Sequence, residues 1–194
     1  MSRGAAWCVV VGMDDDADIV AGLRGGDARA FDLAYGRYRA RIYGFLLRMT
    51  RRQEVAEELL QETFLRLARH ATRLDAETRL RVWLFTVARN LWRSWARWSI
   101  LDAERILEFG ASLLGRRDPT PDEVAVAAQA GRALEAELAA LPDALREVAL
   151  LVAQERLDHA EVAEILGITQ EAARQRWSRA RTRLLAVVEG RDVA

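Results

Sequence analysis

Residues 79–98 read RLRVWLFTVARNLWRSWARW, and this stretch indicates how the chain folds. Its apolar side chains follow the spacing of one helix face, at Val82, Leu84, Val87, Leu91 and Trp95. Its arginines recur at multiples of four residues on another side, at Arg81, Arg89, Arg93 and Arg97. No acidic residue lies between Thr78 and Ile100. The pattern predicts one amphipathic helix with an apolar face and a basic face.

Aromatic residues are interleaved with these arginines, at Trp83, Phe85, Trp92 and Trp98. Arginine neutralises phosphate and flat rings stack on unpaired bases, so this set of side chains suits single-stranded or melting nucleic acid. A core helix with solvated arginines and space-filling tryptophans has the same composition. The stretch alone therefore leaves both interpretations open.

Upstream of this helix the pattern is also helical, with no alternation typical of strands. A short helix over residues 18–23 should stop at two glycines, and Asp27 should cap a longer second helix. The expected core stripe of that helix is Phe31, Tyr35, Tyr38, Ile42, Phe45 and Met49. Thr50 and Gln53 fit a capping box for a third helix, which carries its acidic residues on the outside. We therefore expect an all-α protein.

The sequence GRRDPTPDE, residues 115–123, has the composition of a linker and separates two small helical domains. Met13 is an alternative start of the chain, and the preceding residues form a predicted disordered extension. We predict five segments: extension 1–13, first domain 14–98, flexible linker 99–122, second domain 123–188 and tail 189–194.

The second domain contains a predicted helix-turn-helix. Asp158 and Glu161 fit a capping box, Gly167 fits a left-handed turn residue, and Thr169 can cap the following helix. The outer side of that helix is expected to carry Arg174, Gln175, Ser178, Arg181 and Thr182, flanked by Arg176, Arg179 and Arg183. Such side chains can bind guanine and adenine edges and phosphates, although an ordinary helical hairpin with a cationic face fits the same pattern.

Charge is segregated along the chain, although the formal net charge is zero. Residues 37–52 hold six arginines and residues 174–183 hold five, whereas residues 14–18 and 54–62 hold four acids each. Separate basic and acidic surfaces suit a protein that touches nucleic acid on one side and a basic protein on another. The acidic helix face is equally compatible with a solvated surface.

Several function classes lack support in the sequence. Cys8 is the only cysteine, and no run reaches the length of a membrane span, so we expect a cytoplasmic protein without disulfides or membrane insertion. His70 and His159 are far apart, and no catalytic triad, metal-ligand spacing or phosphate-binding glycine loop is present. We predict no catalytic residue, no metal, no cofactor and no enzymatic activity.

Together these stretches resemble the sigma factors of bacterial RNA polymerase, specifically the small two-domain extracytoplasmic-function (ECF) group of the sigma-70 family. Residues 56–67, AEELLQETFLRL, look like the family's second-region helix that docks on the β′ clamp. Residues 81–98 look like the stretch that melts and reads the minus-ten promoter element. LPDALREVALLV and HAEVAEILGIT look like the fourth-region domain that reads the minus-thirty-five element.

The resemblance implies partners and site residues. The partners are core RNA polymerase, through its β′ clamp and β flap, promoter DNA, and an anti-sigma factor. The polymerase-binding residues would be Glu57, Glu58, Gln61 and Glu62. The minus-ten residues would be Arg79, Trp83, Phe85, Arg89, Asn90, Trp92, Arg93 and Arg97. The minus-thirty-five residues would be Thr169, Arg174, Gln175, Arg176, Ser178, Arg179 and Arg181.

The recognition helix departs from the family pattern in two ways. Residues 171–173 are Glu-Ala-Ala where a Gly-Thr-Val-like start is common, and Trp177 replaces a usual leucine. The first change places an anion near the major groove, so the promoter sequence does not transfer from relatives. Two alternatives remain: an autonomous helix-turn-helix repressor that binds DNA as a dimer, and a divergent sigma-like protein that no longer melts promoters.

Overall fold

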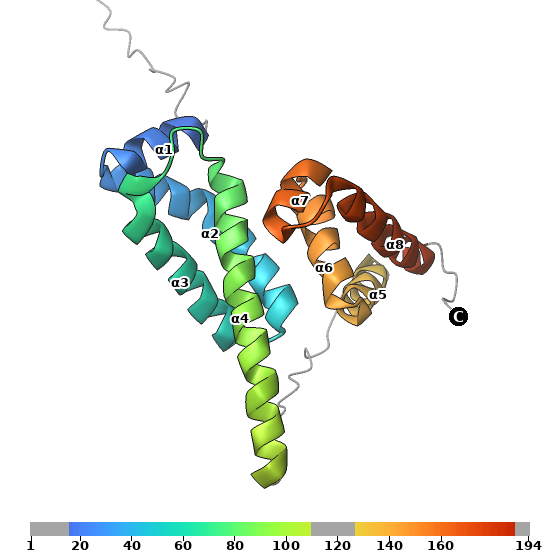
Figure 1. The fold of residues 1–194 in the computed structure, drawn as a ribbon. Helices are drawn as coiled ribbons and strands as arrows, with labels where there is room; N and C mark the ends of the chain where they lie inside the picture. The colour runs from blue at the N-terminus through green and yellow to red at the C-terminus, as the bar shows by residue number, and fades with distance from the viewer. Residues whose placement is uncertain (1–15, 110–126, 189–194) are drawn as a thin grey trace, which may run out of the picture.

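The computed structural model describes residues 16–109 and 127–188, and every element in those ranges is helical (Figure 1). The predicted extension, most of the predicted linker and the predicted tail lie outside the described residues. The protein is all-α, as the sequence pattern predicts.

The first group of helices is a bundle built around α4. Its elements are α1 (Asp16–Arg24), α2 (Ala28–Thr50), α3 (Gln53–His70), the 3₁₀ turn η1 (Ala71–Arg73) and α4 (Leu80–Phe109). Asp27 caps α2 as predicted, because its side chain accepts a hydrogen bond from the Arg29 backbone N–H. Gly26, at φ 75°, makes the left-handed turn between α1 and α2.

The second group forms a smaller bundle. Its elements are α5 (Ala127–Ala140), α6 (Asp143–Ala149), the π-helical segment η2 (Leu150–Gln154), α7 (His159–Leu166) and α8 (Gln170–Val188). Arg146 fixes the corner between α5 and α6, because its guanidinium donates to the backbone oxygens of Leu138, Ala139 and Leu141 at 3.0, 2.8 and 2.6 Å. These carbonyls lie at the end of α5, where no further helical N–H is available.

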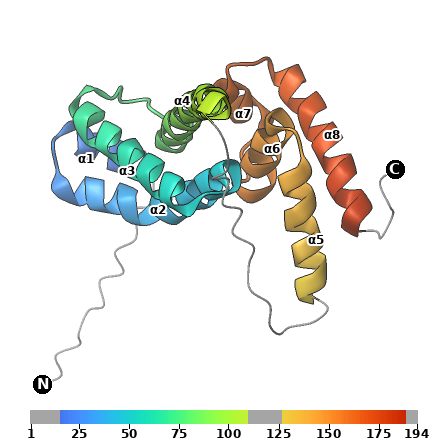
Figure 2. The same cartoon turned by 90° about the horizontal axis from the view of Figure 1, so that it is seen from below.

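The second bundle packs against α4 and against the C-terminal half of α2. Figures 1 and 2 show α1 and α3 on one side of α4 and the second bundle, with α7 nearest to α4, on the other, while the C-terminal end of α2 reaches past α4 toward the second bundle. One hydrophobic cluster runs through both groups: it includes Phe45 and Phe85 of the first and Leu151 and Ile165 of the second, all at most 1% exposed. The apolar core is therefore continuous across the domain interface.

Four local expectations are wrong. Tyr35 is 39% exposed and packs edge-on against Phe64, so it lies beside the core stripe of α2 and not within it. Thr50 does not form a capping box with Gln53, because its hydroxyl is bonded to the backbone of Arg52, which itself precedes α3 without a side-chain cap. The helical spacing of Ala128, Leu134, Leu138 and Leu141 in the sequence predicts that Leu134 faces the core, but Leu134 is 38% exposed.

The fourth concerns the end of α4, which runs to Phe109 although its expected end was near Trp98. The missed signal is the absence of glycine and proline between the two positions, since neither residue interrupts a helical run there.

Candidate nucleic-acid interface

The helix-turn-helix predicted in the second domain is formed by α7 and α8. The Asp158 side chain accepts from the backbone N–H groups of Ala160 and Glu161, both at 2.8 Å, and the Glu161 carboxylate accepts from the Asp158 N–H at 2.9 Å. This is the predicted capping box, and these N–H donors lower the pKa of Asp158, with Glu161 the largest cause. Gly167 ends α7 at φ 60°, as predicted for a left-handed turn residue.

The outer side of α8 presents most of the predicted minus-thirty-five residues to solvent. Arg174, Gln175, Ser178, Arg179 and Arg181 are exposed, whereas Arg176 is half-buried. Thr169 precedes α8, and its hydroxyl oxygen accepts from the Ala172 N–H at 3.1 Å. Glu171 lies among the cations and binds Arg174 at 3.5 Å and Gln175 at 3.2 Å. Ala173 and Ala180 face inward, and Trp177 packs against the core.

The predicted minus-ten residues on α4 divide into two sets. Asn90, Arg93 and Arg97 are exposed, Arg79 immediately before α4 is exposed, and Trp83 is half-buried. Phe85 is fully buried and packs edge-on against Phe45 at 5.7 Å between ring centroids, while Trp92 is 5% exposed.

In this arrangement Phe85 and Trp92 therefore present no accessible face to a base, and their contact with the minus-ten element stays a prediction. The physical reason is helical spacing: Phe85, Ala88 and Trp92 are three and four residues apart, so they share the buried side of α4.

The spacing of the arginines suggested that Arg89 lies on the outer basic side of α4. In the structure Arg89 is buried at the interface between the two domains. Its Nε donates to the Glu147 carboxylate of α6 at 2.8 Å, and the two side chains are 8% and 5% exposed. A second guanidinium nitrogen of Arg89 lies 3.5 Å from the Ile165 carbonyl oxygen. Burial raises the pKa of Glu147, and the Arg89 guanidinium opposes that rise.

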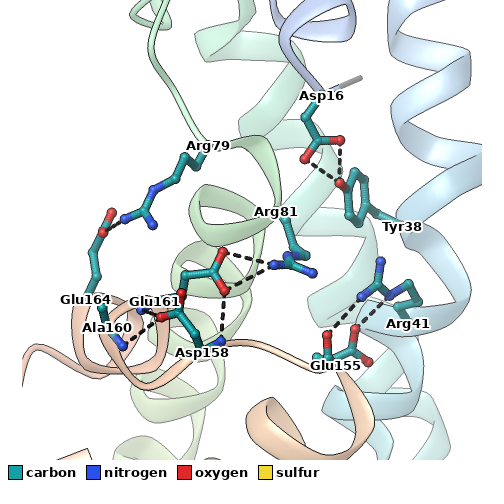
Figure 3. A network of polar contacts seen from close by, with 10 residues as sticks. All are labelled: Asp16, Tyr38, Arg41, Arg79, Arg81, Glu155, Asp158, Ala160, Glu161 and Glu164. Carbon is teal, nitrogen blue, oxygen red and sulfur yellow. Dashed lines mark hydrogen bonds and ion pairs between the residues drawn. The ribbon is translucent and has the colours of Figure 1, made fainter. Parts of the chain in front are cut away.

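Two more ion pairs join the start of α4 to α7. Arg81 donates to both carboxylate oxygens of Glu161, at 2.9 and 3.1 Å, and Arg79 pairs with Glu164 (Figure 3). The Glu161 carboxylate that accepts from Arg81 is the one that closes the capping box at Asp158. One side chain therefore both starts α7 and binds it to α4.

Helix α2 adds two ion pairs to the same interface. Arg41 donates to the buried Glu155 carboxylate at 2.7 Å, and Arg48 pairs with Glu135 of α5 at 2.7 Å. The sequence pattern identified none of these pairs, because each joins residues far apart along the chain and the two domains were expected to be linked flexibly.

Comparison with known proteins connects both domains to one family. The model of sigma-70 region 2 matches residues 34–98, and the model of sigma-70 region 4 matches residues 131–184. The ECF RNA polymerase sigma factor SigM of Bacillus subtilis is 31% identical over 80% of this chain and 93% of that protein. The chain belongs to the ECF sigma factors.

Further relatives of this ECF sigma factor also span both domains. The RNA polymerase sigma factor CarQ of Myxococcus xanthus is 32% identical over 81% of this chain and 88% of that protein. A solved structure of the sigma factor RpoE of Bartonella quintana, in complex with the anti-sigma factor NepR, has a TM-score of 0.68. It is 19% identical and covers 84% of this chain and 98% of that chain, so it supports the fold. The alternative of an autonomous repressor does not account for the match of the first domain to sigma-70 region 2.

The acidic residues of α3 are on the surface of this sigma factor. Glu57, Glu58 and Gln61 are exposed, while Glu62 is half-buried and pairs with Arg66 at 2.9 Å. Glu57 accepts from Gln53 at 2.9 Å. The opposite side of α3 is in the core, with Ala56, Phe64 and Leu67 at most 3% exposed. The four predicted polymerase-binding residues therefore remain accessible on one helix.

Two further observations concern residues 16–109 and 127–188. In these ranges no group of three or more histidine, cysteine, aspartate or glutamate side chains is positioned to hold a metal ion. Among the helices that the structure describes, none has both the length and the apolar composition that crossing a bilayer requires.

Proposed function

We propose that this ECF sigma factor uses three separate surfaces in transcription initiation: the acidic side of α3 for core polymerase, α4 for the minus-ten element, and α8 for the minus-thirty-five element. The observation that carries this proposal is that α4 and α8 present exposed arginines on different domains, each fixed to its own core. Phosphate contacts by arginine give affinity, and two basic helices on one chain can bind two separated DNA elements.

The proposed minus-ten surface is smaller than the sequence suggested. It consists of Trp83, Asn90, Arg93 and Arg97, which are at least partly exposed, together with Arg79 and Arg89, which first have to leave their glutamate partners. Asn90 can bind a base edge, Trp83 can stack on an unpaired base, and the arginines can bind phosphates. Capture of an unstacked base costs a few kcal/mol, which such contacts offset.

The proposed minus-thirty-five surface is the outer side of α8. Arg174, Gln175, Arg179 and Arg181 are exposed there, and Thr169 and Ser178 add hydroxyl groups. A helix of this kind enters the major groove with residues near its N-terminus against the base edges. Glu171 repels guanine acceptors and phosphates but can accept from the amino group of cytosine, so it contributes to promoter choice.

The proposed protein partners follow the same surfaces. Glu57, Glu58, Gln61 and Glu62 would bind the β′ clamp, and the second domain would bind the β flap. An anti-sigma factor is a further proposed partner, because the RpoE relative is named in complex with one. The cytoplasm, where core polymerase acts, is the proposed location.

Reconstituted holoenzyme tests the assignment of the surfaces. Arg179→Ala with Arg181→Ala should remove protection of the upstream element, because each arginine that binds a base edge contributes about 1–3 kcal/mol. Asn90→Ala with Arg93→Ala should leave that protection intact and reduce strand opening, measured by permanganate reactivity of unpaired thymines. Arg29→Ala, in the first turn of α2, removes one positive charge elsewhere and is the control. Unchanged opening in the α4 variant would refute the assignment of that helix.

A further inference from the structure

Trp98 is the most exposed of the large apolar side chains that the structure describes. It is 61% exposed, whereas the others of this kind are at most 41% exposed. Trp95 and Ala96, just before it, still pack against the core, and the C-terminal part of α4 extends beyond the other helices of its bundle (Figure 1). Single exposed apolar residues are common on protein surfaces, so the exposure of Trp98 does not by itself indicate a site. Its neighbours on α4 decide whether the indole has a partner.

Trp98 continues a row of polar residues along α4. Asn90, Ser94 and Trp98 follow one another at intervals of four residues, and Arg93 and Arg97 form the adjacent row. Asn90 and both of these arginines are exposed. Among the side chains that the structure describes, no carboxylate pairs with Arg93 or Arg97. The guanidinium groups beside Trp98 can therefore donate to phosphates.

The length of α4 separates Trp98 from the base that Trp83 would capture. Fifteen positions lie between the two tryptophans, which is about 22 Å along a helix at about 1.5 Å per residue. Stacked base pairs rise by about 3.4 Å each, so this length spans about six base pairs. The C-terminal end of α4 leads along the chain to the second domain, whose helix α8 is the proposed reader of the upstream element. Trp98 therefore lies toward the upstream end of the proposed DNA surface.

We propose that Trp98 binds double-stranded DNA immediately upstream of the melted minus-ten segment. The indole inserts at a base-pair step, and Arg93 and Arg97 bind phosphates beside it. An apolar side chain in this position partly unstacks the step, and contacts with the deformed duplex offset the energy that is lost. The proposal rests on the function proposed above for α4 and extends that surface beyond the residues assigned to the minus-ten element.

The chemistry of the indole predicts a preference among base-pair steps. It has one N–H donor and no acceptor, so it can read few base edges and selects a step mainly by how easily the step deforms. Pyrimidine–purine steps kink readily, whereas A-tracts are stiff. We therefore expect tighter binding when a pyrimidine–purine step lies next to the melted segment.

Charge favours DNA over a protein as the occupant. No acidic residue lies between Thr78 and Ile100, so the part of α4 around Trp98 is basic. Such a surface attracts a polyanion, and duplex DNA presents phosphates on both sides of every step. A basic protein would be repelled from it. An acidic protein is the alternative occupant, and the test below distinguishes it from DNA.

Binding of promoter DNA to reconstituted holoenzyme tests the proposal, with a promoter that transcript mapping has identified. One probe joins a single-stranded minus-ten segment to a short upstream duplex that ends before the minus-thirty-five element. The second probe is the single-stranded segment alone. Trp98→Ala should weaken binding of the first probe about tenfold and leave binding of the second unchanged, because the proposed contact is with the duplex.

Two further variants show whether the effect belongs to the aromatic ring. Trp98→Phe keeps a ring and should retain most of the affinity for the first probe. Leu33→Ala removes another exposed apolar side chain from the same bundle and is the control, which should bind both probes like the parent chain. Circular dichroism checks that all variants keep the helical content of the parent chain.

A fluorescent base analogue reports the insertion itself. Aminopurine at the step next to the melted segment emits more strongly when that step unstacks. Its emission should rise on binding of holoenzyme that contains the parent chain or Trp98→Phe, but not on binding of holoenzyme that contains Trp98→Ala. No rise with the parent chain would overturn the insertion.

The two probes also separate this proposal from the proposed function. An equal loss of both probes in Trp98→Ala would overturn the proposal, because the indole would then contact the melted strand. Loss of core polymerase binding by Trp98→Ala would overturn it in favour of a protein partner. If the parent holoenzyme binds both probes and Trp98→Ala does the same, this inference fails and the sigma function stands. If the parent holoenzyme binds neither probe better than core polymerase alone, the proposed function fails.

Discussion

Arg89 of α4 and Glu147 of α6 form an ion pair of 2.8 Å between the two domains, although 58 positions separate them in the sequence. Each side chain is less than a tenth exposed, so neither charge is solvated in this arrangement of the two domains. Arg89 has the sequence spacing of the exposed arginines of α4, but in the structure it joins the two domains. The proposed DNA surface and the domain interface therefore share part of α4.

Phe85 should behave as a core residue. It is fully buried against Phe45, so Phe85→Ala should lower the free energy of unfolding by about 3–5 kcal/mol, because apolar burial is reduced and a cavity remains. Trp98→Ala, on the same helix but with the side chain 61% exposed, is the control and should change stability by less than about 0.5 kcal/mol. Denaturant unfolding measures both. Equal effects of the two substitutions would contradict the burial of Phe85.

Two helical glycines should respond to alanine in opposite directions. A Cβ at Gly36 meets nothing within 4 Å, so Gly36→Ala should stabilise α2 by about 0.5–1 kcal/mol. A Cβ at Gly22 would lie 2.6 Å from the Ala30 Cβ, so Gly22→Ala should force α1 and α2 apart and destabilise the bundle by about 1–3 kcal/mol. Thermal unfolding of both variants checks the packing; stabilisation by Gly22→Ala would show that α1 does not pack this closely.

The capping box of α7 should contribute measurably to stability. Asp158→Ala removes the acceptor of two backbone N–H groups and should cost about 1 kcal/mol, whereas Asp158→Asn keeps an acceptor and should cost less. The folded chain lowers the pKa of Asp158. The contribution of its carboxylate to the free energy of unfolding is therefore present above the unfolded pKa of about 3.9 and is lost as the pH falls through the folded pKa. Denaturant unfolding from neutral to acidic pH measures this, and a pH response unchanged by Asp158→Asn would exclude the carboxylate as its source.

Tyr38 should resist ionisation. Its hydroxyl donates to the Asp16 carboxylate, with both oxygens within 2.6 Å, and burial with this neighbour raises the pKa of Tyr38 well above its ordinary value of about 10. Folding favours the neutral phenol. The contribution of Tyr38 to the free energy of unfolding is therefore complete below about pH 10 and is lost as the pH rises further. Ultraviolet titration should show one tyrosinate that forms late and that Tyr38→Phe removes. The same late step in Tyr38→Phe would contradict the assignment.

The local features of the fold were predictable because they depend on nearby residues. Asp27, Asp158, Gly167 and Thr169 have the cap or turn roles that their residue types favour, since these bonds close within a few positions. The capping box at Thr50 failed because its hydroxyl bonded locally to the backbone of Arg52 instead.

The candidate site was less predictable, because its accessible surface depends on what packs against each helix. The sequence identified α4 and α8 as basic, but it could not show that Phe85 and Trp92 face inward or that Arg89 meets Glu147. Tertiary contacts of this kind depend on the domain arrangement, which helical periodicity does not encode. Which residues touch polymerase and DNA stays a prediction.

The most direct measurement mixes the full-length chain with bacterial core RNA polymerase and maps transcript starts on fragments of genomic DNA. The sigma-factor account predicts a stable complex with core polymerase and initiation at defined positions, which core polymerase alone does not give. It would be contradicted if the chain failed to bind core polymerase and instead protected a two-fold symmetric duplex site by itself.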